Sequence, residues 1–133
     1  MVYYFDMDGV LSNFHKEPYN YENAINRDWI ANLEPWTYNV RLVNMLIEEG
    51  HKVYILTKAA SEDARDGKVD WLNKYIPSLD MNNFICLIKN GKKVDYIQED
   101  GVLIDDDKRN TIPWEKAGHK ALLLEYKGQR VRL

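Results

Sequence analysis

Five short apolar runs recur along the chain, and a more polar stretch follows each of the first four. The runs are rich in Val, Ile, Leu and Tyr and show no alternation of polar and apolar positions. This pattern is typical of strands covered on both faces of a parallel sheet. The runs occupy residues 2–6, 52–57, 84–88, 102–106 and 120–126.

Three segments between these runs predict helices, because apolar residues recur in them at helical spacing and Gly or Pro marks their ends. The segments are residues 36–49, 61–76 and 110–117, with Pro113 near the start of the third. The alternation of strands and helices predicts an open α/β sheet with right-handed crossovers. In such a sheet the active site forms beyond the carboxyl ends of the strands.

Residues 13–34 interrupt this alternation, since they separate the first strand from the first of these helices. The segment is too long for a plain loop, predicts a short helix around 21–33 and is rich in aromatic residues. We therefore expect a small cap inserted after the first strand. The length of the chain predicts a single domain over residues 1–133, with this insertion inside it.

Composition narrows the class of protein. Hydrophobic residues make up 45% and charged residues 29%, which are ordinary values for a folded globular chain. The net charge of −3 gives no general attraction for nucleic acid, so that partner is disfavoured though open. With Cys86 as the only cysteine, no basic leader and no apolar stretch of about 18 residues, we expect a cytoplasmic protein without a membrane span. Nothing in the sequence indicates an oligomeric state.

Polar residues gather where the predicted strands end, and these ends meet at one edge of a parallel sheet. They are Asp6 and Asp8 after the first strand, Thr57 and Lys58 at the second, Asp105, Asp106 and Asp107 at the fourth, and Lys68 early in the second helix. Clustered carboxylates are costly unless a cation neutralises them, and a set of oxygen ligands suits Mg²⁺. Together with hydroxyl and lysine donors, this predicts phosphoryl transfer through an aspartyl-phosphate.

We predict a different catalytic role for each of the first two aspartates, Asp6 and Asp8. Asp6 would attack phosphorus, while Asp8 would protonate the leaving oxygen and then accept a proton from water. Gly9 directly after the pair permits a sharp turn that brings backbone N–H groups close to phosphate oxygens. Gly9 is therefore a predicted substrate-binding residue.

Four segments, FDMDGVLSNF, ILTK, GKVDWL and VLIDDD, resemble in this order the motifs of the haloacid dehalogenase (HAD) superfamily of phosphohydrolases. Within it, DMDGVL and the position of Lys68 before Trp71 most resemble the 5′(3′)-deoxyribonucleotidase group. The resemblance implies a Rossmann-like, three-layer α/β/α fold with a mainly parallel sheet and a cap after the first motif. Residues 13–34 match a reduced cap.

The resemblance also implies individual roles. Asp6 corresponds to the nucleophile and a Mg²⁺ ligand, and Asp8 to the acid/base, with its backbone carbonyl on the metal. Asp105 corresponds to a further metal ligand and Asp106 to an outer or second one. Thr57 corresponds to the hydroxyl that binds phosphate. Lys68 corresponds to the lysine that neutralises the nucleophile and the phosphate, with Lys58, Lys89 and Lys92 as alternatives.

Three further residues are candidates for contact with the substrate. Lys58 stands where we expect a small residue in the deoxyribonucleotidases, and it could contact a second anionic group. Phe14 and Trp36 could stack on a base or simply pack the insertion onto the body of the domain.

These observations predict a Mg²⁺-dependent phosphomonoesterase that acts on a nucleoside monophosphate or another small phosphorylated metabolite. One alternative is a polynucleotide 3′-phosphatase, because related folds do this with little cap. Another is a non-enzymatic phospho-receiver or binding domain. A receiver is disfavoured, since its phosphorylated aspartate would lie on the middle strand, which here ends in Thr57.

Overall fold

The computed structural model describes all 133 residues and contains one five-stranded sheet in which all neighbouring strands are parallel. The strand order is β3-β2-β1-β4-β5. The strands are β1 (Val2–Phe5), β2 (Lys52–Ala59), β3 (Phe84–Ile88), β4 (Val102–Asp105) and β5 (Ala121–Leu123). The predicted fold class, an α/β Rossmann-like fold with a parallel sheet, is confirmed.

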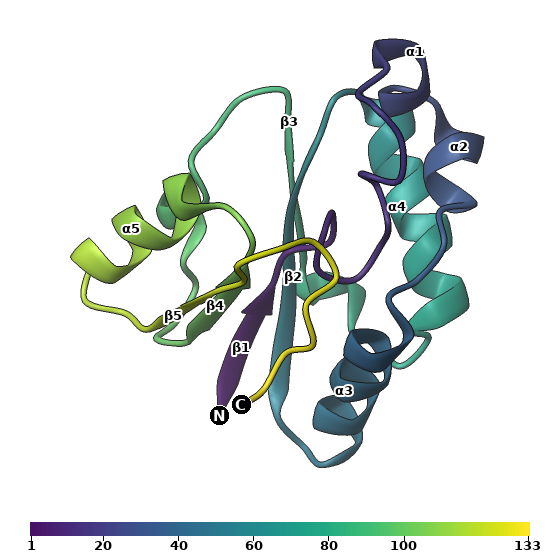
Figure 1. Cartoon of the computed structure of the whole chain (residues 1–133). Coiled ribbons are helices and arrows are strands. Elements are labelled where there is room, and N and C mark those ends of the chain that lie inside the picture. Colours follow the sequence, from purple (N-terminus) through teal and green to yellow (C-terminus); the bar gives the residue numbers. More distant parts are fainter.

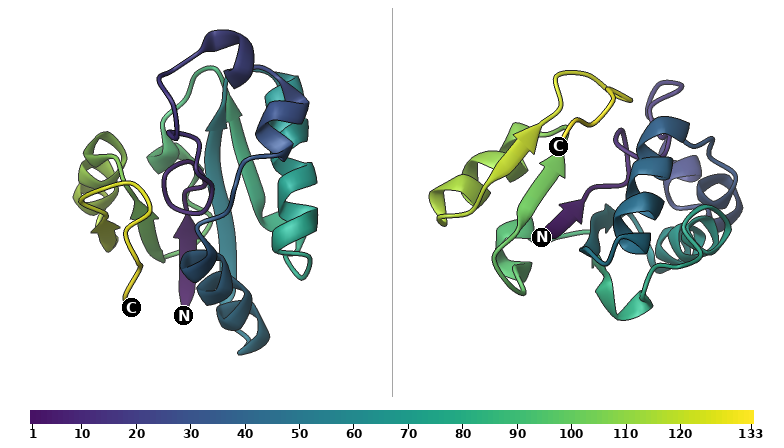
Figure 2. Two further views of the ribbon diagram at one scale, coloured as in Figure 1. Left: turned by 45° about the vertical axis from the view of Figure 1, so that its right-hand side comes forward. Right: turned by 90° about the horizontal axis from the view of Figure 1, so that it is seen from below.

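Helices cover both faces of this sheet. On one face lie α3 (Thr37–Glu48) and α4 (Glu62–Tyr75), and on the other lies α5 (Lys108–Lys116), as Figures 1 and 2 show. Two 3₁₀ turns, η1 (Met81–Asn83) and η2 (Lys93–Tyr96), flank β3. None of the helices combines the length and the apolar character needed to cross a bilayer.

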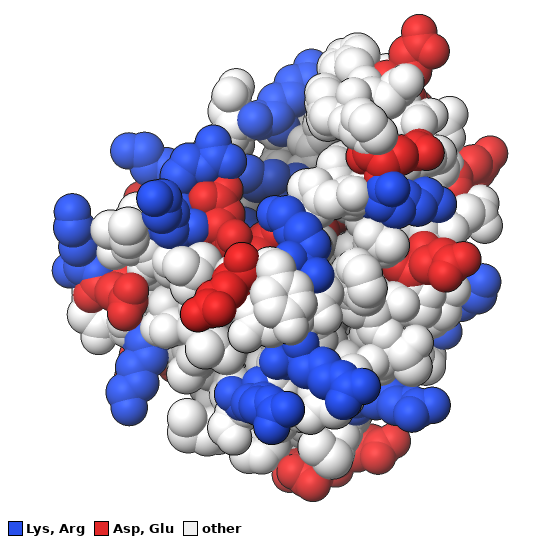
Figure 3. Space-filling model, viewed as in Figure 1, with Lys and Arg blue, Asp and Glu red and all other residues white.

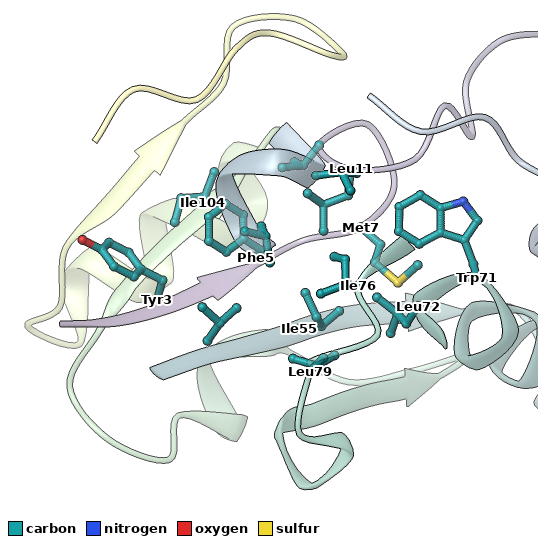
Figure 4. Close-up of a cluster of buried hydrophobic side chains, with 14 of the residues drawn as sticks. Tyr3, Phe5, Met7, Leu11, Ile55, Trp71, Leu72, Ile76, Leu79 and Ile104 are labelled. Carbon is teal, nitrogen blue, oxygen red and sulfur yellow. The ribbon is translucent and has the colours of Figure 1, made fainter. Parts of the chain in front are cut away.

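The side chains of each strand alternate between two hydrophobic cores, as the two-residue period of a strand requires. Phe5 and Ile55 point into the larger core, where they pack with Trp71 and Leu72 of α4 (Figure 4). Tyr4 points into the smaller core on the face of α5 and contacts the Trp114 ring edge-on. Because Asp6 follows Tyr4 by two residues, the same alternation directs the Asp6 side chain towards the α5 face.

The chain order creates a switch point at the middle of the sheet. It runs from β1 through α3 to β2 and through α4 to β3, and then crosses to β4 on the other side of β1. Connections therefore leave β1 and β4 towards opposite faces, which opens a crevice beyond their carboxyl ends. Asp6 and Asp105 lie at this crevice.

The insertion contains two short helices in place of the single one expected, α1 (Tyr21–Ala24) and α2 (Arg27–Ala31). The side chains of Asn20 and Asn26 accept hydrogen bonds from the first turn of each, so the sequence supplies a cap for both. Helix α2 packs closely on α4, since a Cβ on Gly67 would lie 2.5 Å from the Arg27 carbonyl oxygen. The insertion thus rests on the side of the domain (Figure 1).

Three predicted boundaries differ from the structure by two residues or more. Strand β2 continues to Ala59, past the expected end at Thr57, because Lys58 and Ala59 still pair with Leu87 and Ile88 of β3. Helix α5 begins at Lys108 and not at Asn110, because the Asp107 side chain caps it, and Pro113 therefore lies in its interior. Strand β5 ends at Leu123, before the expected residue 126, because the Leu124 N–H donates to the Asp105 carbonyl and the chain then turns away.

Candidate active site

The crevice at the strand ends holds a polar pocket of about 190 Å³ with no hydrophobic lining residue. Its walls include all four acidic residues in the predicted set of site residues, together with basic side chains from five parts of the chain. The acidic residues are Asp6, Asp8, Asp105 and Asp106, and the basic ones are His15, Lys58, Lys93, Arg109 and Lys127. Figure 3 shows Lys and Arg side chains gathered around Asp and Glu side chains near α5 and the adjoining strand ends.

The Asp6 carboxylate is held from two directions. Oxygen Oδ1 accepts hydrogen bonds from the Met7 backbone N–H and from Lys93 Nζ, both at 2.9 Å. The backbone N–H of Asp6 donates to the Ile104 carbonyl at 3.0 Å, which continues the pairing of β1 with β4. These contacts fix the carboxylate at the floor of the pocket, where a phosphate could reach its other oxygen.

Asp8, Thr57 and Lys68 form a second group on the α4 side of the pocket. Lys68, with only 1% of its side chain exposed, donates to Thr57 Oγ1 at 2.7 Å and contacts Asp8 Oδ2 at 3.1 Å. The structure therefore brings together these three residues predicted from the sequence. The Lys68 ammonium fixes the positions of a carboxylate and a hydroxyl that belong to different strand ends.

Asp105 is the most firmly held carboxylate. Lys93 Nζ donates to it at 2.8 Å, Asn110 Nδ2 at 3.1 Å and the Asp107 backbone N–H at 3.0 Å. Burial and the nearby charge of Asp6 nevertheless raise the pKa of Asp105 to about 7. The same two causes raise the pKa of Asp106, although Lys127 opposes them. Around Asp6, Asp105 and Asp106, three carboxylates are thus contacted by only two lysines, Lys93 and Lys127.

This excess of negative charge fits a divalent cation. One carboxylate oxygen each from Asp6, Asp105 and Asp106 lies within 4.8 Å of the other two. Oxygen donors alone favour Mg²⁺ over zinc or copper. The Asp8 carboxylate is not part of this trio.

Lys93 is the lysine that contacts Asp6, and it is not among the lysines expected from the sequence. Its side chain is 2% exposed and bridges Asp6 and Asp105. Burial acts to lower the pKa of Lys93, but the two carboxylates outweigh it and raise the pKa above its usual value. The contact with Asp6 that the sequence analysis expects of Lys68 is thus made by Lys93. The sequence feature that could have indicated Lys93 is its position. Lys93 comes soon after Gly91, at the same sheet edge as Asp105, and precedes Asp105 by 12 residues.

A tight loop follows Asp6. The Met7 carbonyl accepts hydrogen bonds from the backbone N–H groups of Val10, Leu11 and Ser12, which turns the chain back on itself. Gly9 has φ of 81°, and a Cβ at this position would collide with Asp106 Oδ2 and with the Lys127 side chain. Glycine is therefore required both by the backbone conformation and by space.

The C-terminal segment, residues 124–131, closes over this loop. The Gly128 N–H donates to the Gly9 carbonyl at 2.8 Å. Asn39 of α3, which is buried, donates to the carbonyls of Val10 and Gln129 and accepts from the Val131 N–H, each at 2.9 Å. The segment carries Lys127 to Asp106. None of these contacts is visible in the local sequence pattern.

Not every predicted substrate residue reaches the pocket. Lys58 lines it and is exposed. Phe14 does not line it, and its ring packs edge-on against Trp29 at 5.5 Å and His15 at 5.1 Å. Trp36 packs on Gly128 at the start of α3 and does not line the pocket either. Of the two roles open to these rings, the structure shows packing, and His15 is the pocket residue from the insertion.

Comparison with known proteins gives one family and one fold. The family model described as "5' nucleotidase, deoxy (Pyrimidine), cytosolic type C protein" matches residues 16–130. This range begins after Asp6 and Asp8, so the match includes a large part of the chain outside the first motif. No curated protein sequence matches the chain.

Two solved structures resemble the chain in fold. A chain in "Structure of Pnkp1/Rnl/Hen1 complex" matches with a TM-score of 0.65 and 18% identity over 92% of this chain and 45% of its own length. A chain in "Structure of the Pnkp1/Rnl/Hen1 RNA repair complex" matches with a TM-score of 0.69 and 20% identity over 92% of this chain and 42% of its own. The protein thus spans less than half the length of these chains.

Proposed function

Because the chain belongs to the family of deoxy (pyrimidine), cytosolic type C 5′ nucleotidases and is by family a phosphatase of the HAD type, we propose that it hydrolyses a phosphomonoester through an aspartyl-phosphate on Asp6. The observation that carries the proposal is the contact of Lys93 with both Asp6 and Asp105 beside a trio of carboxylates. The family description favours a nucleoside monophosphate as substrate and a cytoplasmic location.

In the first step, a carboxylate oxygen of Asp6 forms a bond to phosphorus while the bond from phosphorus to the leaving oxygen breaks. Asp8 gives its proton to that oxygen, so the product leaves as an alcohol. In the second step, Asp8 takes a proton from water as the water oxygen attacks phosphorus. Asp6 is released and inorganic phosphate is formed, which returns both carboxylates to their starting state.

The remaining residues hold charge and position. Lys93 keeps Asp6 and Asp105 in place and offsets their charge, and Lys68 positions Asp8 and the Thr57 hydroxyl. Thr57 would donate its hydroxyl hydrogen to a phosphate oxygen. Mg²⁺ held by Asp6, Asp105 and Asp106 would neutralise the negative charge of the phosphate and the nucleophile.

A polynucleotide 3′-phosphatase is a second candidate. It is favoured by the position of the insertion, whose helices pack beside α4 and leave the α5 side of the pocket open. The likeness to chains of an RNA repair complex is in keeping with this candidate at the level of the fold.

The test is release of phosphate from p-nitrophenyl phosphate by purified protein with Mg²⁺ or with EDTA. We expect Mg²⁺-dependent turnover that Asp6→Asn abolishes, whereas Asp28→Asn, a change of an exposed carboxylate on α2, keeps it. Unchanged turnover in Asp6→Asn would overturn the mechanism, and no turnover by the unaltered protein on any phosphomonoester would overturn the function.

A further inference from the structure

The catalytic pocket continues into a larger groove on the α5 side of the sheet. The groove has a volume of about 850 Å³ and shares Lys58, Lys93, Asp107, Arg109 and Asn110 with the pocket. Sites for small molecules commonly measure about 300–1,000 Å³. The pocket of about 190 Å³ is too small for a whole substrate, so the rest of the molecule has to extend from it, and the groove provides that space.

The lining of the groove does not suit a nucleobase. Val94 is its one hydrophobic residue, and it has no aromatic side chain on which a base could stack. Of the aromatic residues of the insertion, Phe14 and Trp29 pack against each other, and Tyr19 and Tyr21 are exposed and line neither the groove nor the pocket. The groove therefore fits the hydrophilic part of a substrate, its sugar and charged groups.

Two lysines of the groove are free to meet an anion. Lys93 is occupied by Asp6 and Asp105, and Arg109 pairs with Asp107 at 2.7 Å. Lys58 and Lys92 are exposed and have no ion pair, while Asp95 is the one acidic residue of the groove without a basic partner. Lys58 lies at the junction of pocket and groove, and Lys92 lies farther out beside Gly91.

The loop that carries Lys92 has a defined conformation. The Lys89 N–H donates to the Ala59 carbonyl at 2.8 Å, which ties the loop to the end of β2 just beyond Lys58. Gly91 has φ of 128° and lies directly against the Leu87 side chain, where a Cβ would be 2.6 Å from Leu87 Cδ2. The positions of the two lysines are therefore linked through adjacent strand ends.

We propose that the substrate carries a second phosphate, which lies in this groove against Lys58 and Lys92 while the first phosphate is hydrolysed at Asp6. The inference rests on the proposed phosphatase function. Two kinds of substrate have this chemistry, two phosphates on one sugar. One is a nucleoside 3′,5′-bisphosphate, and the other is a nucleic acid strand that ends in a 3′-phosphate.

The test compares kcat/KM for thymidine 3′-monophosphate, thymidine 5′-monophosphate, thymidine 3′,5′-bisphosphate and a 3′-phosphorylated oligothymidylate, and the bisphosphate is compared with the better of the two monophosphates. We expect the second phosphate to raise kcat/KM by at least about tenfold, the factor that one charge-assisted hydrogen bond supplies. In the variant Lys58→Met/Lys92→Met the ratio of bisphosphate to monophosphate should fall to about one. Lys116→Met, at the exposed end of α5, should keep the ratio.

The outcomes separate this inference from the function on which it rests. Equal kcat/KM for the monophosphate and the bisphosphate, or a ratio that survives the double substitution, would overturn the second-phosphate site and leave the phosphatase intact. A lack of turnover on these probes and on p-nitrophenyl phosphate would overturn the function itself. If the site exists, preference for the bisphosphate assigns it to a small molecule, and preference for the oligonucleotide assigns it to a nucleic acid end.

Discussion

Replacing Lys93 by Met tests the charge balance of the site. The substitution keeps much of the side-chain volume but removes a buried ammonium that contacts Asp6 at 2.9 Å and Asp105 at 2.8 Å. Removing one partner of a buried ion pair costs about 3–5 kcal/mol, because the other charge stays buried without compensation. We therefore expect this loss in the free energy of unfolding at pH 8 in EDTA.

The loss should depend on pH. Asp105 already has a pKa of about 7 in the folded protein, above the ordinary value for aspartate, and removal of Lys93 would raise it further. A folded-state pKa above the unfolded value means that the folded protein binds the proton more tightly, so stability declines as pH rises through this range. The cost of Lys93→Met should therefore be smaller at pH 5 than at pH 8.

Thermal unfolding followed by circular dichroism measures both effects. For a chain of this size the loss corresponds to a decrease in Tm on the order of 10 °C. Lys92→Met is the matched control, since Lys92 is adjacent, exposed and without an ion pair, and its Tm should change by only about 1–2 °C. A Tm for Lys93→Met at pH 8 equal to that of the control would refute the reasoning.

Three further predictions concern the loop, the C-terminal segment and the metal. Gly9→Ala should abolish phosphatase activity. Gly50→Ala is the control, because Gly50 has φ of 86° but open space around it, and this change should lower only stability. Equal phosphatase activities of the two variants would contradict the steric argument. Asn39→Ala removes the three hydrogen bonds of a buried side chain and should lower the free energy of unfolding by about 2–4 kcal/mol in urea denaturation. A loss no larger than that of exposed Asn82→Ala would contradict this prediction. Millimolar Mg²⁺ should raise the Tm of the unaltered protein but not that of Asp105→Asn, and equal shifts would place the cation elsewhere.

The sheet and its acidic edge could be predicted because both follow from local pattern. Apolar runs without alternation indicate buried parallel strands, and a strand end fixes where the next polar residue lies. Asp6 and Asp105 meet for this reason, although 99 positions separate them in the numbering. Thr57 and Lys68 could be added because a helix that follows a strand packs back on it.

The rest of the site depends on turns and distant contacts. Whether Lys92 or Lys93 enters the pocket is decided by the left-handed Gly91 and the short η2, which sequence periodicity does not describe. Asn39 is a polar residue inside an amphipathic helix. It is buried and joins α3 to the C-terminal segment only because residues 124–131 fold back and form hydrogen bonds with it. Trp36 looked available to a substrate because its partner, Gly128, lies near the other end of the chain.

The most direct test of the central claim is capture of the phosphorylated enzyme. The Asp8→Asn variant should still be phosphorylated by p-nitrophenyl phosphate, whose leaving group needs no proton, but it should lose the phosphoryl group slowly because no base activates water. After acid quench, mass spectrometry of the peptides should find one phosphoryl group on Asp6, and none in the variant that also carries Asp6→Asn. A phosphoryl group on another residue, or continued turnover with Asp6 unmodified, would contradict the account.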